Sequence, residues 1–208
     1  MRKPRRRQPR LPLGTAMAEL PCTPALLRVL FDPLSYLHPR RMSLPESLTG
    51  QPAARAAANE LLLAAYQLRN DCIDAELDAM ARQLLRHWSR LPQAAYLIGC
   101  HARRSELAWR GAMLSLPQWA RAFATIDLPT DAAPRQPPPC HNELLRAGYA
   151  RLHCWRERLP VPLAQRFPLL FPPHVDATPT ELGADSKILT LALQYAQRHP
   201  HTPPTTHH

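Results

Sequence analysis

The chain has 208 residues and a formal net charge of +10, from 26 lysines and arginines against 16 aspartates and glutamates. This length allows one main hydrophobic core but hardly two full domains. The 34 leucines far outnumber the 7 valines and isoleucines, whereas β-sheets favour β-branched residues. With 25 prolines and only 6 glycines, the composition predicts a single irregular all-α domain with proline-rich connections, and it excludes a glycine-rich phosphate loop.

The start of the chain is a basic arm. Six of its first ten residues are basic and no apolar period follows, so residues 1–16 are expected to be disordered, with Met17 as an alternative start of translation. The rest of the chain is only mildly basic. No apolar run approaches the 18 residues of a membrane span, and an odd five cysteines without a Cys-x-x-Cys motif suit a reducing compartment.

Three helical patterns are expected before residue 92. A short helix or turn starts at Pro24, and an alanine- and leucine-rich helix over residues 53–70 carries a stripe of Ala57, Leu61, Ala64 and Leu68. A third helix, over residues 71–91, has acidic residues in its first half and arginines in its last, which complements the helix dipole. Its expected buried face is Ile73, Leu77, Met80, Leu84, Trp88 and Leu91.

The longest apolar stretch, residues 94–129, is expected to form the core. Its apolar residues share one helical face as far as Leu114, but Ser105 and Glu106 look like a helix start. The sequence therefore leaves open one long helix or two helices joined near Arg104. Gly99 and Gly111 are expected to let a neighbouring backbone come close, and a further short helix opens at Pro117.

The second half of the chain begins with a proline-rich linker at residues 129–139. A helix over residues 142–159 then carries a heptad seam of Leu145, Gly148, Leu152, Trp155 and Leu159, suited to another helix of this chain or of a partner. The apolar residues 163–173 are too rich in proline for a long helix and are expected to cross the core as a strap. A last helix over residues 185–198 shows Ile188, Leu191, Ala192 and Tyr195.

These patterns predict five segments. They are the basic arm 1–16, a helical part over 17–128, the linker 129–139, a second helical part over 140–198 on the same core, and a disordered tail over 199–208.

No residue pattern indicates catalysis or a bound metal. Cysteine and histidine are neighbours at residues 100–101, 140–141 and 153–154, but known zinc sites space their ligands by several residues. None of the common nucleophile, phosphate-binding or metalloprotease motifs is present, so we expect a protein that is not an enzyme and needs no cofactor. A basic helical nucleic-acid-binding or regulatory protein remains the alternative, because the arm and several arginine pairs could contact phosphates.

Three segments together resemble a known family. They are Phe31-Asp32-Pro33-Leu34-Ser35-Tyr36-Leu37-His38-Pro39, the central Leu97-Ile98-Gly99, and the segment 148–155 followed by Leu159-Pro160. In this order and at this length, residues 26–193 look like the K component of bacterial type III secretion injectisomes, the SctK group that includes YscK and PscK. The basic arm and the linker 129–139 depart from that pattern.

The resemblance implies a soluble helical accessory protein of the cytoplasmic sorting platform, with no catalytic residues. Proteins of the SctK group link the cytosolic domain of the SctD-type inner-membrane ring protein to the SctQ-type pod protein, in an assembly that also holds the stator and the ATPase. The implied location is the cytoplasmic face of the inner membrane, with no nucleic acid bound and no membrane span.

Two surfaces are candidates for binding a partner. Tyr36 and His38 stand where the chain is not helical, so their polar tips could form a docking surface, although Tyr36 could equally pack on the core. The second candidate is the side of the helix over residues 142–159 that carries Arg146, Arg151, Arg156 and Glu157.

Overall fold

A computed structural model describes residues 23–45, 50–71, 77–127, 137–177 and 185–204, and over these ranges it contains helices and no strand, which confirms the all-α prediction. The basic arm 1–16 and most of the linker 129–139 lie outside the described residues. The elements are α1 (Pro24–Phe31), η1 (Pro33–Ser35), α3 (Pro52–Ala65), α4 (Ala79–Arg86), η2 (Trp88–Arg90), α5 (Leu91–Ala102), α6 (Arg104–Leu107), η3 (Trp109–Ser115), α7 (Gln118–Ala124), α8 (His141–Arg156), α9 (Val161–Arg166), η4 (Phe167–Leu170), η5 (Pro173–Val175) and α10 (Ser186–Arg198).

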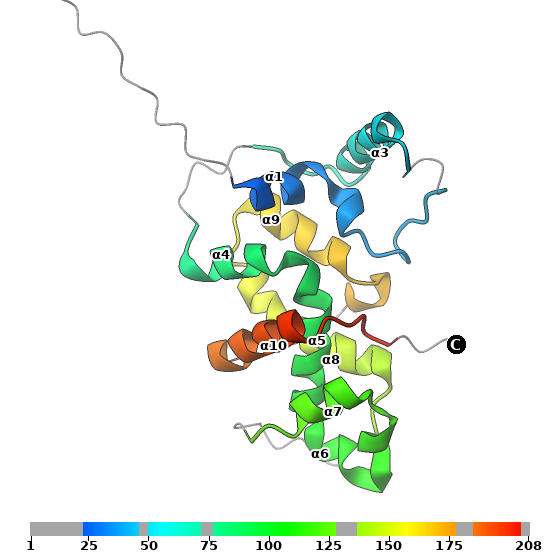
Figure 1. Ribbon diagram of the computed structural model, residues 1–208, viewed down its shortest axis with the longest axis vertical. Coiled ribbons are helices and arrows are strands. Elements are labelled where there is room, and N and C mark those ends of the chain that lie inside the picture. Colours follow the sequence, from blue (N-terminus) through cyan, green and yellow to red (C-terminus); the bar gives the residue numbers. More distant parts are fainter. Residues whose placement is uncertain (1–22, 46–49, 72–76, 128–136, 178–184, 205–208) are drawn as a thin grey trace, which may run out of the picture.

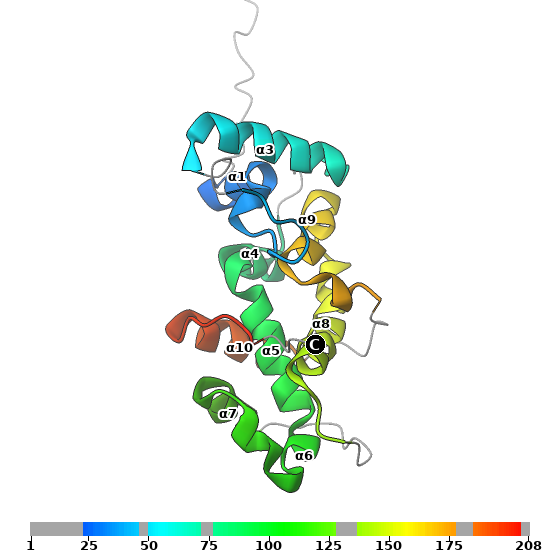
Figure 2. The same ribbon diagram turned by 90° about the vertical axis from the view of Figure 1, so that its right-hand side faces the viewer.

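The described helices form an elongated body with two distinct ends (Figures 1 and 2). Helices α1 and α3 lie at one end, and α6 and α7 lie at the other. Helix α5 runs along the middle against α8, and α10 packs across α5. None of the described helices is long and apolar enough to cross a membrane.

The centre of the fold is the crossing of α5 and α8. A Cβ atom at Gly99 would lie 1.8 Å from the carbonyl oxygen of Leu144, and one at Gly148 would lie 1.7 Å from that of Ala95. Only glycine leaves room for backbones this close, so the expected close approach at Gly99 is confirmed. The heptad seam predicted on α8 is buried at Leu145, Gly148 and Leu152, so it packs within this chain.

The long central pattern is two helices rather than one. Helix α5 ends at Ala102 and α6 starts at Arg104, so the break near Arg104 that the sequence left open is present. Across the break, the Arg103 guanidinium lies 2.8 Å from the carboxylate of Glu106, whose side chain is buried. The prediction of a close approach at Gly111 is wrong. This residue instead turns the chain with a φ of 72°, directly after Arg110, whose φ is 51°.

Before α5, the helices are shorter than the sequence predicted. Helix α3 ends at Ala65 and buries Ala58, Asn59 and Leu62, while Leu61 of the predicted stripe is 71% exposed. The predicted stripe is therefore one position off within the helix, whereas Leu68 after it is buried as expected. The pattern over residues 71–91 is not one helix, because α4 starts at Ala79 and ends before His87. Residues 72–76 of that pattern lie outside the described ranges. Asp78 caps α4 by accepting a hydrogen bond from the backbone N–H of Ala81 at 2.6 Å.

The segment expected as a strap, residues 163–173, lies in the core as short helical turns. Its Phe167 and Phe171 rings are fully buried and pack against each other at a centroid distance of 5.5 Å. Helix α10 buries Leu189, Ala192, Leu193 and Ala196, so Leu191 of the predicted face is exposed instead.

The chain after α10 keeps packing on the body as far as His201, where we expected disorder from His199. The Gln93 side chain donates to the carbonyl oxygen of His199 at 2.6 Å and accepts from the N–H of His201 at 2.9 Å. The His201 ring stacks on Trp119 of α7, with ring centroids 5.1 Å apart and planes 12° from parallel. This segment therefore ties α5 to α7.

A fully buried arginine holds the α1 end together. Arg166 of α9 is 0% exposed, and its guanidinium donates to the carbonyl oxygens of Leu30, Arg69 and Pro162 at 2.7 to 2.8 Å. It also donates to the Asn70 side chain at 2.7 Å. These acceptors come from three parts of the chain, so one side chain fixes α1, the segment after α3 and α9 relative to one another. Burial lowers the pKa of this guanidinium from its ordinary value.

We expect Gly148→Ala to lower the free energy of unfolding by about 3 kcal/mol, because a Cβ atom at this crossing must push two helices apart. Gly50→Ala is the matched control, since a Cβ atom there meets nothing within 4 Å and should change stability by less than about 0.5 kcal/mol. Urea denaturation followed by circular dichroism measures both. Equal stability of the two variants would show that the crossing can relax.

Arg166→Met should lower the free energy of unfolding by about 3 kcal/mol or more, because several buried carbonyl oxygens lose their donor. Arg28→Met removes an exposed arginine from neighbouring α1 and should change stability by less than about 0.5 kcal/mol. The same urea titration tests both variants. A stable Arg166→Met protein would mean that water satisfies those carbonyl groups.

Candidate functional site

Tyr36, the first residue proposed for docking, packs on the core rather than standing free. Its hydroxyl donates to the carbonyl oxygen of Val29 at 2.8 Å and also pairs with Arg166. Its ring meets the buried Trp88 edge to face at a centroid distance of 6.0 Å. Burial raises the pKa of the hydroxyl well above its ordinary value. The structural alternative stated for Tyr36 is therefore present, and a part in docking stays a prediction.

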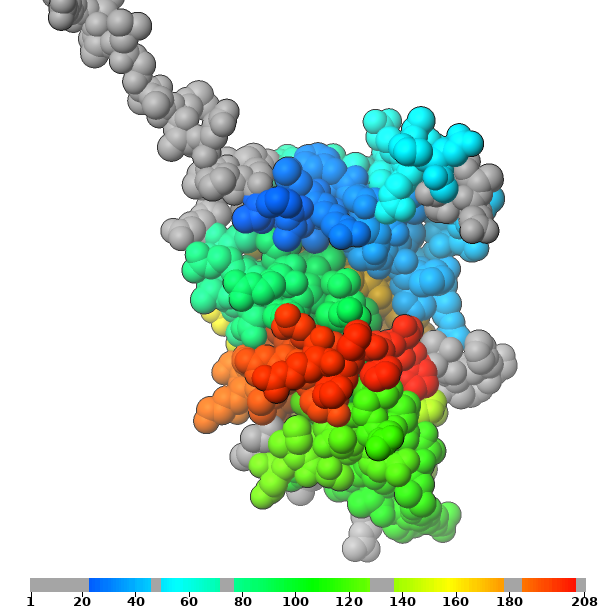
Figure 3. All heavy atoms as spheres, viewed as in Figure 1, coloured from blue at the N-terminus to red at the C-terminus, as the bar shows by residue number. Residues whose placement is uncertain are grey.

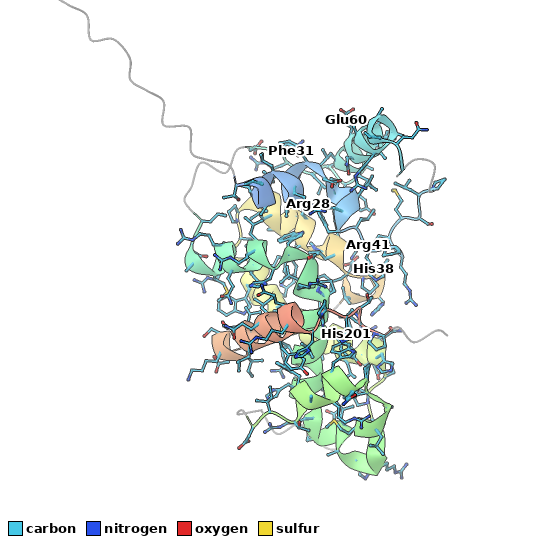
Figure 4. The ribbon with its side chains drawn as sticks, in the orientation of Figure 1. Arg28, Phe31, His38, Arg41, Glu60 and His201 are labelled. Atoms are coloured by element: carbon cyan, nitrogen blue, oxygen red, sulfur yellow. The ribbon has the colours of Figure 1, made fainter. Side chains whose placement is uncertain are left out.

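The loop after Tyr36 is fastened to the segment 167–176. The backbone N–H of His38 donates to Leu169 at 2.8 Å, and the Nε–H of Arg41 donates to Phe171 at 2.6 Å, both to carbonyl oxygens. Arg41 also holds the Asp176 carboxylate with two hydrogen bonds, of 2.6 and 2.9 Å. Its side chain is only 9% exposed, so this pair is part of the fold. Figure 4 labels His38 and Arg41 next to each other.

His38 is half-buried in a positively charged neighbourhood. Its Nδ1 accepts a hydrogen bond from the backbone N–H of Arg40 at 3.1 Å. Burial, together with the charges of Arg40, Arg41 and His174, lowers the pKa of His38 from 6.5 to about 4. The imidazole is therefore neutral at pH 7 and can accept this bond.

His174 connects the two surfaces that the sequence proposed separately. Burial lowers its pKa, and the charges of Arg146 and Arg40 lower it further. Arg146 comes from α8, His174 from η5 and Arg40 from the loop after His38, so charges from distant parts of the chain act on one imidazole. We call His38, Arg40, Arg146 and His174 the His174 surface. The sequence proposed His38 and Arg146 but missed His174, whose position depends on how the strap folds.

The other residues proposed on α8 do not all face solvent. Arg146 and Glu157 are exposed, as expected. Arg156 is half-buried, because its Nε–H donates to the carbonyl oxygen of Ala164 and its guanidinium hydrogen-bonds His153. Arg151 is half-buried as well. The expected exposed surface is therefore reduced to Arg146 and Glu157, and no contact of these residues with a partner has been tested.

Within the described ranges, no three histidine, cysteine, aspartate or glutamate side chains come close enough together to hold a metal ion. Burial raises the pKa of the Cys100 thiol to about 12, so this sulfur is protonated and a poor ligand or nucleophile at pH 7. His141, the neighbour of Cys140, hydrogen-bonds the hydroxyl of Tyr96 through Nδ1 at 2.7 Å and so links α8 to α5.

Comparison with known proteins decides the family. Residues 26–198 match the model of a family described as bacterial type III secretion apparatus protein, OrgA/MxiK. The chain belongs to the OrgA/MxiK family. It is 48% identical over 177 residues to the oxygen-regulated invasion protein OrgA of Salmonella typhimurium, which covers 85% of this chain and 89% of OrgA. It is 27% identical over 174 residues to MxiK of Shigella flexneri, and the match covers 83% of this chain and 89% of MxiK. No solved structure matches the chain.

OrgA and MxiK are proteins of the SctK group, so the resemblance noted in the sequence is confirmed. The matched region of the OrgA/MxiK family starts in α1 and ends with α10, and it includes all four residues of the His174 surface. The chain is thus a component of a type III secretion apparatus, with protein partners inside that apparatus.

The low pKa of His38 predicts a loss of stability in acid. In the unfolded chain the imidazole takes up a proton near pH 6.5, whereas the folded protein resists it until about pH 4. The free energy of unfolding should therefore fall as the pH drops through this window. His38→Asn retains an acceptor for Arg40 and should lose less stability than the natural chain between pH 7 and pH 4.5. Urea titrations at both pH values measure the difference.

His199→Asn serves as the control, because it removes an exposed imidazole at the end of α10 instead of one in the loop after Tyr36. Between pH 7 and pH 4.5 this variant should lose as much free energy of unfolding as the natural chain. An equal loss in all three proteins would contradict the assignment to His38.

Proposed function

We propose that this chain is a non-enzymatic adaptor of the sorting platform at the cytoplasmic face of the inner membrane. In this role it links the cytosolic domain of the SctD-type ring protein to the SctQ-type pod protein, and through that protein reaches the stator and the ATPase. The observation that supports the proposal most strongly is membership of the OrgA/MxiK family over residues 26–198.

The shape of the molecule supports an adaptor with two binding ends. At the α1 and α3 end, the exposed apolar side chains are Leu27, Phe31 and Leu61. At the opposite end, Trp109 is 44% exposed and Leu114 is 72% exposed on η3. Large apolar side chains on an otherwise polar surface are common where proteins bind one another. Two such places at opposite ends suit a protein that joins two others.

The His174 surface supplies a third feature, a basic patch between the two ends. Arg40 and Arg146 are exposed, and the imidazoles of His38 and His174 beside them are neutral at pH 7 because their pKa values are lowered. The Asp176 carboxylate is already held by Arg41. Such a patch favours a partner surface rich in carboxylates and speeds the encounter through charge attraction. We place the docking of one apparatus protein here.

A nucleic-acid-binding function is the alternative, and one experiment distinguishes the two. The chain is co-expressed with the SctQ-type pod protein or with the ring protein's cytosolic domain, purified by tag, and analysed by size exclusion in moderate salt. A stable complex supports the adaptor. If a well-folded sample binds neither protein but binds duplex DNA in a salt-sensitive manner, the alternative replaces it.

The double variant Arg40→Glu with Arg146→Glu should bind its apparatus partner roughly tenfold more weakly, because like charges then face the carboxylates of the partner. Both side chains are exposed, so the melting temperature should stay within a few degrees. Tyr36 is unsuitable for this test because it packs on the core. Isothermal titration against the purified partner gives the affinity.

Arg198→Glu is the matched control, since it reverses an exposed charge at the end of α10. It should leave the affinity unchanged. Equal weakening by the control would indicate a general effect of net charge, and undiminished binding by the double variant would remove the His174 surface from the interface.

A further inference from the structure

A groove of about 360 Å³ lies between α1 and α4, away from the residues of the His174 surface. We call it the α1–α4 groove. Its apolar lining includes Ala25, Val29 and Leu85, and Trp88 lines it as well. Arg28 of α1 and Arg86 of α4 complete the two sides. In Figure 3 the spheres of α1 meet those of α4 along this region of the face shown.

The charged side chains that line the α1–α4 groove are both positive. Arg28 and Arg86 are both exposed, and the described residues that line the groove include no aspartate or glutamate. Elsewhere in this part of the molecule arginines are paired with carboxylates, as Arg55 is with Asp32 at 2.8 Å. In contrast, the described residues provide no ion pair for Arg28 or Arg86. The groove therefore favours an anionic ligand that approaches both guanidinium groups.

Trp88 lines the groove with a side chain that is almost fully buried. Its side chain is only 5% exposed, and its Nε1–H has no hydrogen-bond partner among the described residues. The ring is held in place by Tyr36 and by Phe167, which it meets edge to face at 6.0 and 6.2 Å. A buried donor without an acceptor is costly, but this nitrogen has almost no accessible surface, so an acceptor in the groove would reach it only if neighbouring side chains shifted.

Arg86 also lines a second groove on its other side. This groove lies between α4 and α10, has a volume of about 500 Å³, and is lined by polar side chains that include Gln83, Gln194 and Gln197. Arg86 therefore stands between a partly apolar and a polar groove. An extended chain of several residues could place a carboxylate at Arg86 and contact both grooves.

We propose that the α1–α4 groove binds a short acidic segment of a protein partner. The carboxylates of the segment bind Arg28 and Arg86, and an apolar side chain packs on Val29 and Leu85 beside Trp88. The apolar lining separates this ligand from nucleic acid, because a phosphate backbone would leave that lining unused. The proposal involves different residues from the His174 surface and does not depend on which apparatus protein binds there.

The test uses the full chain labelled with ¹⁵N and a synthetic six-residue peptide of alternating glutamates and leucines. The four tryptophans give four indole N–H signals, and the spectrum of Trp88→Phe assigns the one from Trp88. Titration with millimolar peptide should shift the Trp88 signal most. A matched peptide with glutamines in place of the glutamates should bind about fivefold more weakly or not at all.

Variants then assign the contacts. Arg28→Gln and Arg86→Gln should each weaken binding about fivefold, whereas Arg86→Lys, which keeps the charge, should stay close to the natural chain. Arg146→Gln in the His174 surface is the control and should bind normally. Melting temperatures recorded for every variant show whether the fold is intact.

Three results would overturn the proposal. The Trp88 signal does not move at millimolar peptide, the glutamine peptide binds as well as the glutamate peptide, or the Arg28 and Arg86 variants bind as tightly as the natural chain.

Discussion

The contact of Gly99 with Gly148 sets the distance between α5 and α8, and most other elements are placed relative to that pair. Helices α7 and α10 pack on α5, while η5 packs on α8. The two backbones touch without side chains between them. Since α7 and α10 pack on α5 as well, eleven of its residues are buried. A helix buried this completely cannot show a clear polar face. Its sequence is accordingly rich in apolar residues, and the polar side chains of Gln93 and His101 are buried as well.

Away from this crossing, arginine side chains hydrogen-bond backbone carbonyl oxygens that a longer helix would satisfy internally. The 25 prolines keep the connecting helices short, and short helices leave carbonyl oxygens without an internal partner. The forked guanidinium groups of Arg166 and Arg41 supply donors to those oxygens. The many arginines of the chain therefore serve structure as well as surface charge, and the formal charge of +10 overstates how basic the accessible surface is.

The sequence predicted the all-α class, the close approach at Gly99 and the α8 seam, because these follow from composition, periodicity and the absence of a side chain. It placed the stripe of α3 one position off, because that helix packs on only one side and several of its faces carry alanine or leucine. It could not predict Arg166 in the core, since an arginine is normally an exposed residue. The His174 surface was half predicted: His38 and Arg146 were proposed, but their meeting depends on where the proline-rich strap runs.

The stack of His201 on Trp119 lies beyond the part of the chain that the family match covers, which ends at residue 198. A protein trimmed to the family boundary would therefore lose the segment that joins Gln93 to the backbone at His199 and His201. Trimming there would also expose the face of Trp119 that the imidazole covers. For protein production, a useful C-terminal boundary therefore has to retain His201.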